Sequence, residues 1–62
     1  MNATIKVKMD NAAFGDDPTA ELARILRALA GRIDEGVNLD EDYSLRDVNG
    51  NRVGECIIRG RP

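Results

Sequence analysis

Residues 17–36, DPTAELARILRALAGRIDEG, decide the fold of this chain, because they describe one amphipathic helix with a start and an end. Pro18 suits the first helical position, where its missing N–H would be unpaired anyway. Asp17 can accept hydrogen bonds from the free amides of the first turn. Gly36 suits the left-handed conformation that commonly ends a helix. We therefore predict a helix over about residues 18–35.

The predicted helix has an apolar face and a charged side. Its apolar residues recur at three- and four-residue steps, the spacing that places side chains on one side of a helix. Arg24, Arg27 and Arg32 fall mainly on the opposite side. Gly31 either permits a close approach to a sheet or marks the last regular turn. The side chains that we expect to pack on the core are Leu22, Ile25, Leu26, Leu29 and Ile33.

The segment before the helix predicts a strand and a polar connection. Residues 3–9 alternate strictly, with Ile5, Val7 and Met9 on one side, which is typical of a half-buried strand. Phe14 is the only large apolar side chain of the connection that follows. We expect Phe14 to fill one end of the core, since the chain offers no other bulky group there.

The last third of the chain predicts a β-hairpin. Residues 42–48 and 51–59 are strand-like runs joined around Asn49 and Gly50. An Asn-Gly pair in this position is a strong hairpin signal, because both residues tolerate positive φ.

The register of this hairpin has two alternatives. A three-residue loop with Gly50 in the left-handed conformation pairs Leu45 with Val53. A two-residue loop instead pairs Leu45 with Gly54. The sequence leaves both registers open.

The order strand, helix, strand, strand predicts an α+β fold of β-α-β-β type in a single domain over residues 1–62. A right-handed crossover makes the first two strands parallel in direction, so the third strand fits between them and runs antiparallel to both. We expect a three-stranded antiparallel sheet in order 2-3-1 with one helix packed on one face. The adjacent Ile57 and Ile58 face opposite sides, which favours a central or doubly covered last strand. The other sheet face is expected to be open to water and to carry Thr4, Lys6, Lys8 and either Arg46 or Arg59.

The residues needed for catalysis or metal binding are missing. The chain has no histidine and one cysteine, Cys56, which we expect to be a buried apolar side chain. Nucleophile-base pairs of the Ser/His or Cys/His type cannot be built, and no glycine-rich phosphate loop follows a strand. The acidic residues around Glu41 lack the spacing of a calcium loop. We therefore predict no enzyme activity, no catalytic residues, no cofactor and no metal site. No apolar run is long enough for a membrane span, so we expect no membrane partner.

The most unusual feature is an acidic run. Residues 34–47 contain six carboxylates and one cation, Arg46, whereas the rest of the chain has a net positive charge. A solvated loop is one interpretation. The other is a negative patch that imitates nucleic-acid phosphates and binds a basic groove, with an affinity that falls as salt rises. The predicted partner-binding residues are Asp34, Glu35, Asp40, Glu41, Asp42 and Asp47.

The predicted open sheet face offers an opposite hypothesis, because it would carry Lys6, Lys8, Arg59 and Arg61. Nucleic-acid binding on a sheet face usually adds aromatic side chains for base stacking, and this face would offer at most Tyr43. Lysines on an edge strand more often prevent aggregation. We therefore expect no direct nucleic-acid binding, and these charges favour a monomer.

The segments MDNAAFGDDPTAELARILRALAGRI and LRDVNGNRVGE, residues 9–33 and 45–55, resemble a family of very short phage- and mobile-element-encoded proteins. The chain as a whole resembles the small phage-encoded anti-CRISPR proteins directed against type I-C CRISPR-Cas. This resemblance implies a non-catalytic inhibitor, working in the cytoplasm of the infected bacterial host. It would bind the type I-C surveillance complex (Cascade) and block recognition of target DNA.

The acidic run would then occupy a basic DNA-binding channel, with the large DNA-recognising subunit as the expected contact. The shared motifs are a cap, a core helix and a turn, so they indicate the fold better than a function. Exposed apolar contacts through Tyr43, Leu39 or Val37 are an alternative to the charges. The alternative functions are an uncharacterised phage accessory protein that binds another host protein, or a small nucleic-acid-binding module that uses its basic sheet face.

Overall fold

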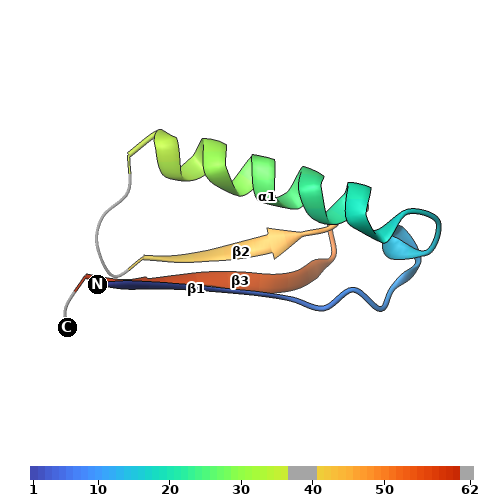
Figure 1. Ribbon diagram of the computed structural model, residues 1–62, viewed down its shortest axis with the longest axis horizontal. Coiled ribbons are helices and arrows are strands. Elements are labelled where there is room, and N and C mark those ends of the chain that lie inside the picture. The colour runs from blue at the N-terminus through green and yellow to red at the C-terminus, as the bar shows by residue number, and fades with distance from the viewer. Residues whose placement is uncertain (37–40, 61–62) are drawn as a thin grey trace.

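The computed structural model describes residues 1–36 and 41–60, and it confirms the predicted α+β fold. A single helix lies along one face of a small sheet (Figure 1). The elements follow the order β1 (Asn2–Val7), a 3-10 turn η1 (Ala12–Phe14), α1 (Pro18–Asp34), β2 (Asp42–Arg46) and β3 (Arg52–Arg59).

The sheet has the predicted topology. Its order is β1-β3-β2, and β3 runs antiparallel to both neighbours. β3 is therefore the central strand. Ile58 is buried beneath α1, whereas Ile57, on the opposite side of the same strand, is half-buried.

Both predicted hairpin registers occur, one on each side of a β-bulge. Next to the turn, Arg46 pairs with Arg52 and Asp47 N donates to Asn51 O at 2.9 Å, which closes a three-residue loop with Gly50 at φ 87°. Beyond the bulge, Leu45 pairs with Gly54, the pairing predicted for the shorter loop. The bulge reconciles the two because it adds one residue to β3.

The helix begins and ends where its sequence signals predict. Asp17 Oδ1 accepts a hydrogen bond of 3.1 Å from Ala20 N, and Pro18 occupies the first turn. Gly36 has φ 107° and donates its N–H to Ile33 O. Gly31 does not mark a close approach to the sheet, since a Cβ there would meet no atom within 4 Å.

The core lies between the sheet and α1, and Phe14 closes one end of it as predicted. Two expected core residues are instead partly exposed, Ile5 by 49% and Leu26 by 38%. The first strand also ends at Val7, two residues earlier than predicted. The buried apolar side chains are Phe14, Ile25, Leu29, Leu45, Val53, Cys56 and Ile58.

Two helix arginines explain this uneven coverage. Arg24 Nη2 donates to Arg46 O at 3.1 Å, and Arg32 Nη1 donates to Ser44 O at 2.9 Å. The Arg32 guanidinium also lies 5.0 Å from the ring centre of Tyr43. Our prediction that the arginines lie opposite the sheet is therefore wrong for these two, because their long stems reach its backbone. The helix is held toward β2, which leaves the β1 side of the core less covered.

Candidate partner-binding surface

The predicted acidic residues divide between the two ends of the molecule. The end of α1 and the start of β2 lie together at one end, whereas β2 finishes at the other (Figure 1). Asp34, Glu35, Glu41 and Asp42 belong to the first end. We call these four residues the acidic end. Asp40 lies outside the described residues.

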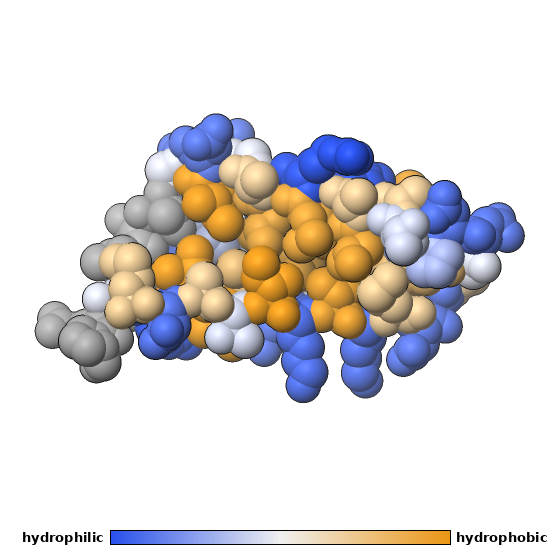
Figure 2. Space-filling model, viewed as in Figure 1, coloured by the Kyte–Doolittle hydropathy of each residue, from blue (hydrophilic) through white to orange (hydrophobic). Residues whose placement is uncertain are grey.

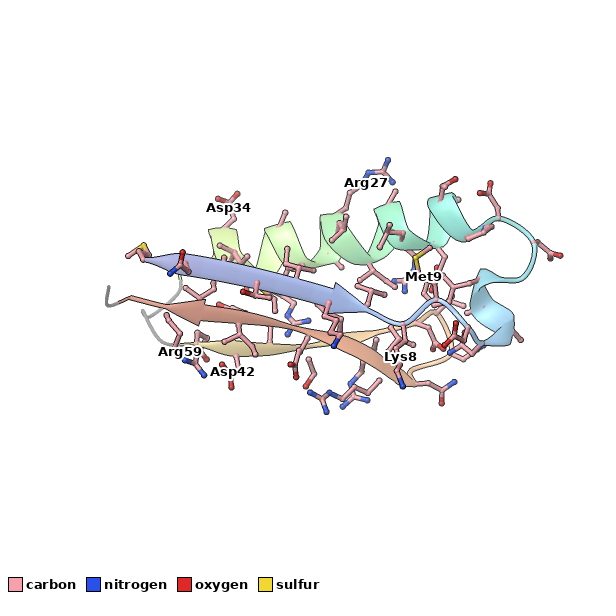
Figure 3. The ribbon with its side chains drawn as sticks, turned by 60° about the horizontal axis from the view of Figure 1, so that its bottom comes forward. Lys8, Met9, Arg27, Asp34, Asp42 and Arg59 are labelled. Carbon is pink, nitrogen blue, oxygen red and sulfur yellow. The ribbon has the colours of Figure 1, made fainter. Side chains whose placement is uncertain are left out.

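Asp34 and Glu35 are the most available carboxylates of the acidic end. Both are exposed, and Asp34 points away from the sheet (Figure 3). Within residues 1–36 and 41–60, no ion pair joins either side chain to a cation. Their position at the C-terminus of α1 is electrostatically unfavourable for the helix, because the macrodipole is negative there. The two charges therefore contribute little to the fold and are free for a partner.

Glu41 and Asp42 are less available. Asp42 Oδ1 accepts from Arg59 Nη1 at 2.8 Å, in a pair whose side chains are both more than half exposed. Such a pair stabilises little but cancels one negative charge locally. Glu41 is half-buried, and its backbone oxygen accepts from Ile58 N at 2.8 Å.

Asp47 is not part of any acidic surface, which corrects its prediction as a partner-binding residue. Its residue exposure is only 4%, and it sits at the turn between β2 and β3. Its oxygens accept from Asn11 Nδ2 at 2.7 Å, from the N–H groups of Asn49 and Asn51 at 2.9 Å each, and from Asn51 Nδ2 at 3.2 Å. An Asp two residues before Asn-Gly could have signalled this role, because Asp commonly accepts from backbone amides in turns.

Glu21 also accepts hydrogen bonds that hold the fold together, a role that its position in the sequence does not indicate. Glu21 lies in the first turn of α1, where a negative charge suits the positive end of the helix, but its side chain is buried. Its carboxylate accepts from Arg24 at 2.8 and 3.0 Å and from Val48 N at 2.8 Å. The helix is thereby joined to the hairpin turn.

Hydrogen bonds shift the pKa values of both buried carboxyls. The bond from Arg24 lowers the pKa of Glu21, and the Val48 amide adds to this against the opposing effect of burial. Burial by itself would raise the pKa of Asp47, but the bonds from Asn51, Asn11 and Asn49 together outweigh it and lower the pKa. Both groups are therefore held as carboxylates inside the fold.

The outer sheet face, opposite α1, has a shallow basic groove of about 290 Å³. The arginine that lines it, Arg52, is paired with Glu55 at 3.0 Å. Tyr43 does not lie on this face, because it packs against the core opposite Cys56. The predicted contribution of Arg61 lies outside the described residues. The groove is lined by Lys6, Lys8, Arg52, Val53, Gly54 and Glu55.

Across residues 1–36 and 41–60, no three His, Cys, Asp or Glu side chains come together as metal ligands. The same residues include no helix with the length and apolar character to cross a membrane. Comparison with protein families, curated proteins and solved structures found no match to this chain.

Proposed function

We propose that this protein is a non-catalytic inhibitor that binds the type I-C surveillance complex in the cytoplasm of an infected bacterium and blocks recognition of target DNA. The acidic end is the observation that supports it. Exposed Asp34 and Glu35 lie at this end on the helix, whereas Asp42 lies at the same end on the sheet and points away from the helix (Figure 3). A groove lined with lysine and arginine would attract these carboxylates electrostatically, over a distance that shortens as the salt concentration rises.

The size of the acidic end limits how it would work. Duplex DNA carries one charge per about 1.7 Å of its axis, so a long mimic needs many carboxylates. At the acidic end, Asp34 and Glu35 form no ion pair within the described residues. Asp42 adds a third carboxylate, but its charge is partly neutralised by the ion pair with Arg59. Charge would therefore replace only a few phosphates, and the bulk of the domain would exclude the DNA.

The chemistry of the remaining side chains supports binding rather than catalysis. The chain has no histidine, and the thiol of Cys56 is buried with the core. The carboxylates with shifted pKa values, Glu21 and Asp47, are used by hydrogen bonds that hold the fold together.

A charge-reversal experiment tests this function. The double variant Asp34→Lys, Glu35→Lys should bind the purified type I-C complex at least about tenfold more weakly, because attraction becomes repulsion. The matched control is Asp10→Lys, Asp16→Lys, which makes the same change of charge at exposed positions away from the acidic end. The control should keep its affinity and its inhibition of DNA binding. Equal binding by both variants would refute a role for the acidic end.

Absence of binding by the unaltered protein would instead overturn the choice of partner. The chain would then be better described as an accessory protein for another host protein. Circular dichroism of each variant shows whether the fold is retained.

The basic groove supports a second candidate function, binding of a single nucleic-acid strand. Lys6, Lys8 and Arg52 could contact phosphates there. Phe14 and Tyr43 are the only aromatic residues of the chain, and both pack with the core, so the groove has none for base stacking. A gel-shift assay with bare DNA and RNA separates the two functions. The inhibitor should shift neither, whereas a shift that Lys6→Glu, Lys8→Glu abolishes would favour the groove.

A further inference from the structure

The β1 side of the molecule has an apolar surface that α1 leaves uncovered. Figure 2 shows hydrophobic residues gathered on the face between the helix and β1. Leu26 lies about 200° around the helix from Arg24, which reaches toward β2, so Leu26 faces the β1 side. We call this surface the β1 face; its members are Ala3, Ile5, Val7 and Met9 from the first strand and its extension, and Leu26 from α1.

The backbone along this face is also unpaired on one side. β1 is an edge strand, bonded only to β3 within the described part of the chain. Lys8 N donates to Val53 O at 2.7 Å, so the polar groups of the even-numbered residues point toward β3. Because these directions alternate along a strand, the N–H and C=O groups of Ala3, Ile5 and Val7 point outward.

The strand is complementary to a second copy of itself. An antiparallel pair with its twofold axis at Ile5 would place Ile5 opposite Ile5 and Ala3 opposite Val7, and these are the residues whose backbone groups point outward. Lys6 would lie opposite Thr4 of the other copy, so no two lysines would face each other. Figure 3 shows Lys8 pointing away from α1 and Met9 pointing toward it, as this alternation requires. Registers that place two lysines opposite each other would be disfavoured by charge repulsion, whereas this register avoids that repulsion.

We propose that the β1 face is the interface of a homodimer. Two β1 strands pair antiparallel about Ile5 and join the two sheets into one, and Leu26 of each copy covers the apolar side of the junction. The pairing satisfies the outward backbone groups and removes Ile5 from water, so both the hydrogen bonds and the hydrophobic effect favour it. This inference is independent of the proposed inhibitor function.

Sedimentation equilibrium between about 1 µM and 1 mM protein tests the proposal. The mass should rise with concentration from the 6.8 kDa of one chain toward twice that value. Ile5→Lys should raise the dissociation constant at least about tenfold, because it buries a charge at the twofold axis. Val48→Lys is the matched control, since Val48 is also exposed but lies on the hairpin turn, and it should leave the constant unchanged. Circular dichroism confirms that each variant is folded.

Hydrogen exchange gives a second measurement that locates the interface. The amides of Ala3, Ile5 and Val7 should gain protection as the protein concentration rises, whereas those of Thr4 and Lys6 should be protected at every concentration. A mass of one chain throughout the range would overturn the proposal and leave the β1 face to a different partner. Equal effects of the two lysine substitutions, or a dimer in which the Ile5 amide stays unprotected, would also overturn it.

Discussion

Asn11 and Asp47, 36 residues apart in the chain, are joined by a hydrogen bond of 2.7 Å from Asn11 Nδ2 to Asp47 Oδ2. Asn11 also caps η1, since its Oδ1 accepts from Ala13 N at 3.0 Å. The pair therefore fastens the connection before α1 to the hairpin turn. Phe14, the last residue of η1, is buried in the core, so the short turn that Asn11 caps also closes one end of the apolar interior.

Removing this link should destabilise the protein. Asn11→Ala leaves the buried carboxylate without one of its donors, and we expect the free energy of unfolding to fall by about 1–3 kcal/mol. The matched control is Asn49→Ala, because only the backbone N–H of Asn49 contacts Asp47. The control should change stability by less than about 0.5 kcal/mol. Urea denaturation measures both, and equal losses would show that the side-chain bond is unimportant.

Stability should fall in acid because of Glu21 and Asp47. Their pKa values are lowered in the folded protein from ordinary values of 4.5 and 3.8. The unfolded chain therefore binds protons first as the pH falls, which favours unfolding. The contribution of both groups is complete above about pH 5 and is lost as the pH falls through their folded pKa values. Urea midpoints between pH 7 and pH 3 measure this loss.

The variant Glu21→Gln, Asp47→Asn tests which groups cause the acid effect. It should be less stable than the unaltered protein at pH 7 and should have a shallower decline of stability toward pH 3. An unchanged slope would assign the acid sensitivity to other carboxyls.

Two glycines should respond oppositely to alanine. A Cβ on Gly54 would clash with Lys6 O on the neighbouring strand, so Gly54→Ala must push β1 and β3 apart. We expect the free energy of unfolding to fall by about 1–3 kcal/mol, the usual cost of inserting atoms into a tightly packed site. Gly31→Ala meets open space within α1 and should stabilise the protein by up to about 1 kcal/mol. Thermal unfolding of the two variants compares them directly, and a stable Gly54→Ala protein would contradict the close approach.

The thiol of Cys56 should report opening of the core. Cys56 is almost fully buried on the central strand. A chain of this size is expected to be stable by about 3–9 kcal/mol, so the thiol should react with a disulfide reagent at least about 100-fold more slowly than in denaturant. Fast labelling of the native protein would show that β3 opens locally.

The helix and its limits were predictable from the sequence because they depend on neighbouring residues. Asp17 and Pro18 start α1, and Gly36 ends it, through contacts within one turn. The topology followed from the order of elements and the handedness of the crossover. Even the ambiguity of the hairpin was informative, since the bulge beside Leu45 lets both registers occur.

Only the tertiary structure decided what each charge does. Asp34 and Asp47 are both acidic residues of the same run, yet one is exposed and the other is buried at the opposite end. The difference arises because Asn11, which is distant in sequence, folds back to the turn and supplies a hydrogen bond there. Local composition describes how many carboxylates a segment has. Burial and hydrogen bonding depend on which remote groups the fold brings within reach, and these determine whether a carboxylate holds the structure together or remains available to a partner.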